Sequence, residues 1–414
     1  MARLLTRADQ AAGGRILDAA LYALSGLFAL VTTLSSTLLP HRAWGSVAAW
    51  GYLAALLLTP FVHRLLLTWA TFAAVSLLPL VIQAVQRAGG RLDRAQEEVS
   101  VVEEMGHGLA STGSPYLSRA DIAALPAQDQ LDAYHPYQPG MAVFGLPRAW
   151  FGDFWWTDSR VWFAVVMVGA VAWATRFLLT TGLEVRALQA ATIFPVCALT
   201  LATGGDDMPV LALCLLSIAF CARHRFGAAG LAVGAAAALK PFAFPVVIVL
   251  AVLAFATRPP RNSPDAGRPW RRFLPGAVGL PVLALVPALL VNADAYVENV
   301  VRFPLGHGLV SSPAQSPFPG YLIASSVPGG RYVALGLLVL AGLTIAALLL
   351  RRPPRTAASA ALFCGYGLLT AILLMPTTRF GYLLYPIAFL VWATALSRPT
   401  ATSAPRRDTA LYRQ

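Results

Sequence analysis

The sequence predicts an all-α protein that crosses a membrane about ten to twelve times, and two observations lead to this fold class. Hydrophobic residues make up 57% of the 414 positions and charged residues 12%, with a mean hydropathy of +0.64. Soluble domains are less apolar and carry a larger share of charge. Apolar runs also recur along the whole chain, separated by short polar segments. The chain is therefore expected to be a polytopic membrane protein.

The candidate spans differ in length, which affects how each is expected to cross the bilayer. Several are shorter than the roughly 20 residues that cross unaided, so we expect some to be broken, tilted or buried among other helices. The number of spans stays open mainly within residues 188–256. The twelve candidate spans are residues 16–39, 48–62, 66–85, 161–180, 188–203, 210–222, 228–239, 242–256, 274–291, 332–350, 357–375 and 381–396.

The basic residues predict the orientation of these spans. All five arginine clusters fall on one side if both termini are cytoplasmic, which satisfies the positive-inside rule for a multi-pass plasma-membrane protein. The formal net charge of +12 then reflects topology and attraction to anionic lipid. Nucleic-acid binding is not expected, because no basic stretch is interleaved with aromatic residues on a soluble domain. The clusters are residues 3–15, 223–225, 258–272, 351–355 and 398–407.

This orientation divides the chain into six parts and places two loops outside. The expected parts are N-terminal spans (1–86), an outward loop with an amphipathic helix at 94–110 (87–158), central spans (159–291), a second outward loop (292–330), C-terminal spans (331–396) and a disordered cytoplasmic tail (397–414).

Glu98 is the most informative residue of the first outward loop. Along residues 94–110, Val99, Val102 and Met105 define an apolar helical face, and Glu98 falls between Val102 and Met105. Desolvation raises the pKa of a carboxyl group and makes it a better proton acceptor. Glu98 is thus a candidate general base, with Glu97 as the alternative if the helix register slips.

A structural interpretation of Glu98 remains open beside the catalytic one. A carboxylate at a helix start is stabilised by the helix dipole, and Arg94 at i−4 is a possible ion-pair partner. Glu103 and Glu104 fall on the opposite arc of the helix, where we expect a solvated face.

Three cations are candidates for binding an anionic group. Lys240 is the one lysine among 31 basic residues and precedes a proline in an apolar hairpin. A cation within the membrane is a functional hypothesis by default, although a snorkelling side chain is the alternative. Arg302 and Arg379 lie on the predicted outward side, and a topological cation is the alternative for both.

Several polar and aromatic residues are candidates for substrate contacts. Asp206 and Asp207 form either a site for substrate hydroxyls or the polar part of a short turn. Tyr116, Tyr134 and Tyr137 either stack on a substrate or anchor the loop at the bilayer surface.

We expect no metal and no cofactor. The histidines of the outward loops, His107, His135 and His307, show no ligand spacing of the H-x-x-x-H kind, and His307 is retained as a substrate-contact candidate. The four cysteines lie inside predicted spans, so we expect them to be packing residues.

Five sequence elements in order resemble a known family. They are GSPY at 113–116, YHPYQP at 134–139, GGDD at 204–207, AGLAVGAAAALK at 229–240 and RFGYLLYP at 379–386. This order resembles the GT-C class of integral membrane glycosyltransferases, and within it the polyprenol-phosphate-sugar-dependent family 87 of actinobacteria. The family usually has Asp at the loop position and one span before it, whereas this chain has Glu98 and three predicted spans.

The resemblance implies an inverting transfer of mannose or another pentose or hexose. The donor would be a polyprenyl-phosphate sugar, and the acceptor a hydroxyl of a lipid-linked or cell-envelope glycan on the outer face, among membrane lipids. Glu98 would take the acceptor proton, and Lys240, Arg302 and Arg379 would bind the donor phosphate. A transporter or flippase of a lipid-linked intermediate is the alternative, which the absence of a visible repeat disfavours.

Overall fold

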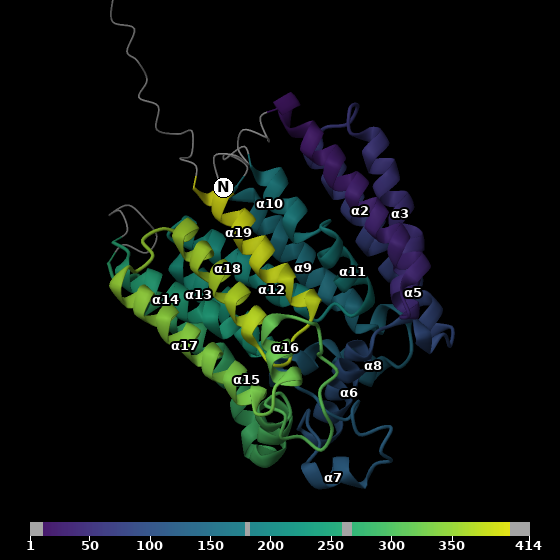
Figure 1. Cartoon of the computed structure of the whole chain (residues 1–414), viewed down its shortest axis with the longest axis vertical. Coiled ribbons are helices and arrows are strands. Elements are labelled where there is room, and N and C mark those ends of the chain that lie inside the picture. The colour runs from purple at the N-terminus through teal and green to yellow at the C-terminus, as the bar shows by residue number, and fades with distance from the viewer. Residues whose placement is uncertain (1–10, 179–182, 259–266, 398–414) are drawn as a thin grey trace, which may run out of the picture.

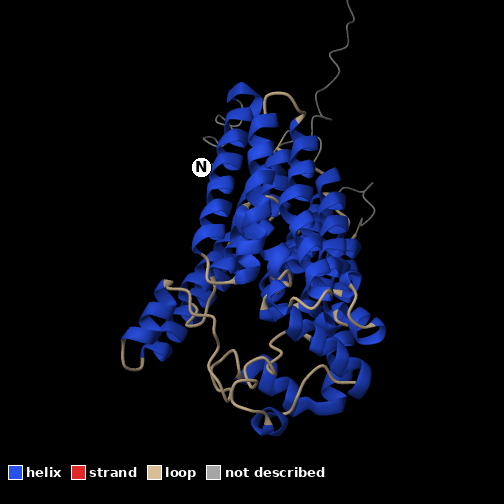
Figure 2. Cartoon of the chain, turned by 90° about the vertical axis from the view of Figure 1, so that its right-hand side faces the viewer, coloured by secondary structure: helices blue, strands red, loops and turns tan. Residues whose placement is uncertain are grey.

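The computed structural model describes residues 11–178, 183–258 and 267–397, and within these ranges the chain is helical. Its one β-type contact there is an isolated bridge between Gln315 and Thr378. Figure 2 shows the helices gathered in a bundle, with the longer loops at one end. The predicted all-α fold class is confirmed.

Each of the twelve predicted spans overlaps one helix or one helix pair. They are α2 (Arg15–Ser35), α3 (Leu39–Leu58), α4 (Arg64–Phe72) with α5 (Leu78–Ala88), α9 (Ser159–Arg176), α10 (Glu184–Ala191) with α11 (Pro195–Thr203), α12 (Asp207–Ala222), α13 (Phe226–Leu239), α14 (Phe244–Ala256), α15 (Pro269–Val297), α17 (Gly330–Arg351), α18 (Ala357–Leu374) and α19 (Leu384–Leu396). The connecting segments add α6 (Glu97–Thr112), α7 (Arg119–Ala124), α8 (Leu146–Phe151) and α16 (Pro319–Ser326).

Not every helix is long enough to cross a bilayer by itself. In the described ranges, five helices are long and apolar enough, and the pair α10 and α11, bent by 43°, makes a sixth if it forms one span. Shorter apolar helices occupy residues 207–222, 226–239, 241–256 and 380–396. Helix α12 is almost wholly buried, as expected for a short helix surrounded by others.

The break between α10 and α11 has a local cause. Pro195 has no N–H group and begins α11, so the helical hydrogen-bond ladder stops before it. The backbone N–H groups of Thr192, Ile193 and Phe194 all point to the carbonyl of Gln189. The Tyr52 hydroxyl donates to the carbonyl of Ile193 at 2.6 Å, which satisfies a group freed by the break.

Small residues allow α13 and α15 to pack closely. A Cβ added to Gly234 would lie 2.1 Å from the carbonyl oxygen of Gly276, and one added to Gly230 would lie 2.0 Å from that of Phe273. Within a bilayer, such close approach supplies van der Waals contact that apolar side chains alone do not. Helix α13 thereby holds its C-terminal end, with Lys240, against the rest of the bundle.

The polar loops gather at one end of the bundle. Helices α6, α7, α8 and α16 lie there, while the described ends of the chain, at the start of α2 and the end of α19, lie at the other (Figure 1). Both described ends are thus on the same side of the bundle, opposite helices α6, α7 and α8.

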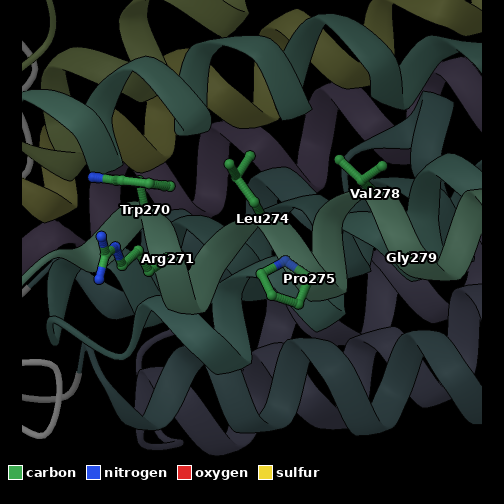
Figure 3. A pocket seen from close by; sticks show the side chains of 6 residues that line it. All are labelled: Trp270, Arg271, Leu274, Pro275, Val278 and Gly279. Carbon is green, nitrogen blue, oxygen red and sulfur yellow. The ribbon is translucent and has the colours of Figure 1, made fainter.

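A surface groove of about 550 Å³ lies along the first turns of α15. Its walls are mainly apolar, and Trp270, which stacks on Phe255, stands beside Arg271 at one end (Figure 3). No carboxylate lines this groove, whereas carboxylates are numerous in the loops at the polar end of the bundle.

The close packing of α13 predicts different outcomes for two glycine substitutions. Gly234→Ala should destabilise the protein by about 1–3 kcal/mol, because the new methyl group overlaps the backbone of α15. Gly342→Ala is the matched control, since nothing lies within 4 Å of a Cβ at Gly342 of α17. Thermal unfolding in detergent should show a lower Tm for Gly234→Ala alone. Equal Tm values would contradict the close packing.

Candidate functional site

The turn between α11 and α12 places two carboxylates at the polar end of the bundle. Gly205 adopts a φ of +88°, which glycine tolerates best, and an added Cβ would lie 2.8 Å from the Phe163 ring. The turn is therefore tight, and it brings Asp206 and Asp207 to the start of α12. Both side chains are buried.

Lys240 faces these two carboxylates from the junction of α13 and α14. Its backbone is extended, as expected for a residue before proline. The ammonium nitrogen lies 2.7 Å from Asp206 and 2.6 Å from Asp207. Burial by itself lowers the pKa of Lys240, but the two carboxylates outweigh burial and raise it above its ordinary value. Lys240 thus remains charged.

Tyrosine side chains complete this cluster. The Tyr385 hydroxyl donates to Asp207 at 2.7 Å, and the Lys240 nitrogen lies 5.2 Å and 5.6 Å from the ring centroids of Tyr137 and Tyr382. The acid–lysine cluster, defined as Asp206, Asp207 and Lys240, has two carboxyl groups and one ammonium group. Its carboxyl oxygens can accept hydrogen bonds from hydroxyl groups.

Glu98 lies in the first turn of α6 and forms an ion pair with Arg379. The Glu98 side chain is 16% exposed and that of Arg379 is 36% exposed. The suggested Arg94 partner is wrong, because Arg94 bonds to Gln86 and to its neighbour Asp93 instead. Helix α6 begins at Glu97, so Arg94 lies before the helix and i, i+4 geometry does not apply.

Glu98 and Arg379 lie beside the acid–lysine cluster. A Cβ added to Gly204 would lie 3.6 Å from a carboxylate oxygen of Glu98, and Gly204 is two residues before Asp206. Arg379 is three residues before Tyr382, whose ring faces Lys240. Residues from four distant parts of the chain thus meet at one end of the bundle.

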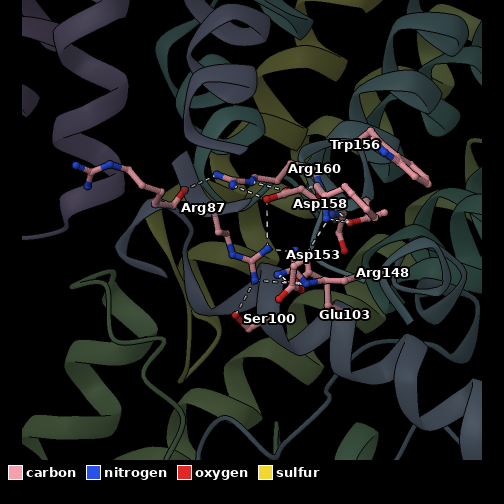
Figure 4. Close-up of polar contacts among 12 residues, drawn as sticks. Arg87, Ser100, Glu103, Arg148, Asp153, Trp156, Asp158 and Arg160 are labelled. Atoms are coloured by element: carbon pink, nitrogen blue, oxygen red, sulfur yellow. Dashed lines mark hydrogen bonds and ion pairs between the residues drawn. The ribbon is translucent and has the colours of Figure 1, made fainter. Parts of the chain in front are cut away.

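A second group of buried charged residues anchors α6 to neighbouring segments. Arg87 bonds to both oxygens of Glu103 at 2.7 Å and to Asp158 at 3.2 Å, and Arg148 contacts Glu103 at 3.2 Å (Figure 4). Arg160 bonds to both oxygens of Asp158, at 2.8 and 2.7 Å. We call these five residues the arginine network.

The arginine network corrects one prediction. Glu103 was expected on a solvated face, but its side chain is only 7% exposed, because two arginines from outside α6 neutralise it. Glu104 is 59% exposed, as predicted. A signal in the sequence could have found the network: Arg87, Arg148 and Arg160 flank or occupy a predicted outward loop, against the positive-inside trend.

The remaining candidates lie in the loop cluster around Glu298. Its fully buried carboxylate accepts from Arg119 and Tyr134, both at 2.8 Å, and from Arg302 at 3.4 Å. Arg302 also pairs with Asp294. The His307 side chain is exposed, and its carbonyl accepts from Arg119. The loop cluster therefore brings together Arg302, His307 and Tyr134. None of these contacts involves Lys240.

The loop tyrosines are more buried than a bilayer anchor requires. Tyr134 stacks on Phe303 with centroids 4.2 Å apart, so protein covers one of its faces. The Tyr116 hydroxyl donates to the backbone of Tyr137 at 2.7 Å, and both side chains are about 6% exposed. Within the described ranges, no group of three His, Cys, Asp or Glu side chains has the geometry to hold a metal ion.

The arginine network predicts a pH-dependent stability. Burial alone would raise the pKa of Asp158, but Arg160 and Arg87 outweigh it and lower this pKa to about 2. The folded-state pKa is thus below the unfolded one, so the carboxylate contributes on the order of 2 kcal/mol above about pH 4, and this is lost as the pH falls toward 2. The Tm difference between wild type and Asp158→Asn should narrow below about pH 4. Asp153→Asn, at a carboxylate that is 73% exposed, is the control and should show little difference at any pH.

Solved structures with detectable similarity include two of ArnT from Cupriavidus metallidurans. The apo structure matches with 18% identity and a TM-score of 0.45, and the structure bound to undecaprenyl phosphate with 17% identity and a TM-score of 0.47. Each match covers 78% of this chain and 58% or 59% of ArnT. The chain thus spans less than three fifths of the ArnT length.

No curated protein matches the chain. A family comparison does give a match: the model of Glycosyltransferase family 87 aligns with residues 134–376. This range contains the acid–lysine cluster, Arg160 and, of the loop cluster, Glu298, Tyr134, Arg302 and His307. Glu98, Arg119 and Arg379 lie outside it. It covers more than half of the 414 residues, and the chain therefore belongs to glycosyltransferase family 87.

Proposed function

We propose that the protein transfers a sugar from a polyprenyl-phosphate carrier to a hydroxyl group, with inversion at the anomeric carbon. The sugar would be mannose or another pentose or hexose, and the acceptor a lipid-linked or cell-envelope glycan at the outer face of the plasma membrane. Membership of a glycosyltransferase family supports the reaction type. The observation that carries the proposal is the meeting of Glu98, Arg379 and the acid–lysine cluster at the polar end of a membrane bundle.

Glu98 is the proposed general base. In an inverting transfer, the acceptor oxygen attacks the anomeric carbon while the bond from that carbon to the phosphate oxygen breaks, and the leaving group departs as polyprenyl phosphate. The acceptor proton must go to a base as the new bond forms. Glu98 is partly exposed beside Gly204, whereas Glu103 is committed to two arginines.

Arg379 is the proposed ligand of the donor phosphate. A carboxylate held by a guanidinium is a weaker base than a free one, so Glu98 must lose this partner before it accepts a proton. The donor phosphate is a stronger competitor than water for the guanidinium. Donor binding would therefore move Arg379 from Glu98 to the phosphate, where it stabilises the charge that grows on the leaving group.

The acid–lysine cluster is proposed to bind sugar hydroxyls. Asp206 and Asp207 each have one carboxyl oxygen paired with Lys240, and their remaining lone pairs suit hydroxyl donors. Lys240 as a second phosphate ligand stays a prediction, and it would require the ammonium to exchange one carboxylate. Phosphate binding by Arg302 also stays a prediction. So do substrate contacts by the loop tyrosines and by His307.

Replacing the proposed base tests the mechanism. Glu98→Gln should lower kcat about 100-fold or more, because the amide cannot accept the acceptor proton. The assay follows label from polyprenyl-phospho-mannose or polyprenyl-phospho-arabinose into a lipid-linked glycan in proteoliposomes. Glu97→Gln is the matched control, since that neighbouring side chain is exposed, and it should retain activity.

Two outcomes would count against this mechanism. Full activity of Glu98→Gln rules Glu98 out as the base. Movement of the lipid across the proteoliposome bilayer, without any glycan extension by the wild type, supports a flippase instead.

The role of Arg379 is tested through donor affinity. Arg379→Gln should raise the KM for the donor roughly 10-fold or more, because a charge-assisted hydrogen bond to phosphate is lost. Arg302→Gln is measured alongside, since Arg302 is the other predicted arginine ligand and its partners are Asp294 and Glu298. An unchanged donor KM in Arg379→Gln would remove Arg379 from the phosphate site.

A further inference from the structure

We infer that Arg160 is a positioning residue that sets the separation between Glu98 and the acid–lysine cluster. The inference rests on the proposed function, because it concerns how the base is placed relative to the sugar. Arg160 belongs to α9. Its hydrogen bonds go neither to Glu98 nor to the acid–lysine cluster. Its effect would pass through the backbone segments that precede both.

The contacts of Arg160 connect those two segments directly. One terminal nitrogen of its guanidinium donates to the carbonyl of Arg94 at 2.7 Å and to the carbonyl of Ala202 at 3.0 Å. Arg94 is four residues before Glu98, and Ala202 is four residues before Asp206. A single side-chain nitrogen thus holds together the start of the base helix and the end of α11.

Asp158 fixes the direction of this guanidinium. Its two oxygens accept from the other two nitrogens of Arg160, and one oxygen also accepts from the Arg160 backbone N–H at 3.1 Å (Figure 4). Arg87 holds the same carboxylate at 3.2 Å. The Arg160 side chain is 0% exposed, so water does not compete for these bonds. The Arg160 guanidinium is therefore held rigidly, and this fixes the spacing of the Arg94 and Ala202 carbonyls.

A second connection runs parallel to the first, one residue or two further along each segment. The backbone N–H of Gln96 donates to the carbonyl of Thr203 at 2.9 Å, and the Thr203 hydroxyl donates to the Gln96 side chain at 2.8 Å. The two connections together bring Glu98 beside Gly204. Loss of either should let the base shift, and a displacement of about 1 Å from the reacting atoms can cost about 100-fold in rate.

The substitution Arg160→Lys distinguishes a positioning role from simple neutralisation of Asp158. A lysine ammonium can neutralise Asp158, but it is a single point and cannot bond to both carboxylate oxygens while also reaching both carbonyls. Arg148→Lys is the matched control. Arg148 belongs to the same network through Glu103 and bonds to neither carbonyl.

The kinetic experiment compares Arg160→Lys and Arg148→Lys with the wild type. We expect kcat to fall about 10- to 100-fold in Arg160→Lys, with the donor KM within about twofold and a Tm close to that of Arg148→Lys. Wild-type kcat in Arg160→Lys, or an equal loss in Arg148→Lys, would overturn the inference. Absence of transfer by the wild type would instead overturn the proposed function.

A separation measurement tests the inference independently of activity. Cysteines introduced at Gln96 and Thr203 face each other across the second connection, and the four native cysteines are buried. The introduced pair should form a disulfide readily in the Arg160 background and at least about 10-fold more slowly in Arg160→Lys. Equal rates in both backgrounds would show that Arg160 does not set the separation.

Thr203→Val provides a test if Arg160→Lys does not fold. Valine keeps the shape of threonine and removes the hydroxyl bond to Gln96, so kcat should fall several-fold with little change in donor KM. Wild-type kcat in a folded Thr203→Val variant would then count against positioning by these connections.

Discussion

The polar end of this protein depends on the neutralisation of carboxylates that are buried at the edge of a membrane bundle. An isolated carboxylate there would be costly to keep charged, and removing one partner of such a pair typically costs about 3–5 kcal/mol. Lys240 faces Asp206 and Asp207, Arg160 faces Asp158, and Arg87 faces Glu103. The pairs of Lys240 and Arg87 join separate parts of the chain, and Arg160, held by its neighbour Asp158, bonds to the carbonyls of the distant residues Arg94 and Ala202.

Different forces determine the helices and the ion pairs. This explains why the sequence could predict the helices but not which charged residues pair. Each apolar run became a helix because backbone groups in lipid must bond within their own segment, and this is a local property. Glu98, Lys240 and Arg379 could also be chosen as candidates from the sequence, since each stands where charge is unexpected. Their pairing was not, because Glu98 and Arg379 are 281 positions apart and no periodicity relates them.

The errors in the prediction come from the same cause. Glu103 was assigned to a solvated face because its helical arc is polar, and the sequence does not state that Arg87 and Arg148 cover that arc. The Arg94 partner was suggested by i, i+4 spacing, but the helix begins only at Glu97. The contacts of Arg160 were not predicted because two of its acceptors are backbone carbonyls, and a backbone acceptor has no residue type to recognise.

The ion pairs at the polar end differ in solvent exposure, and this difference distinguishes the buried pairs from the one that solvent can reach. The Arg160, Arg87 and Lys240 side chains are at most 7% exposed, and each is bonded to groups that would lose their partner if it moved. Arg379 is 36% exposed, and water can reach it while it holds Glu98. Exchange of partners is inexpensive only where solvent or a ligand can replace the lost charge. In the proposed reaction, the Glu98–Arg379 pair is therefore the one among these at which the donor phosphate would take the cation and leave the carboxylate free to accept a proton.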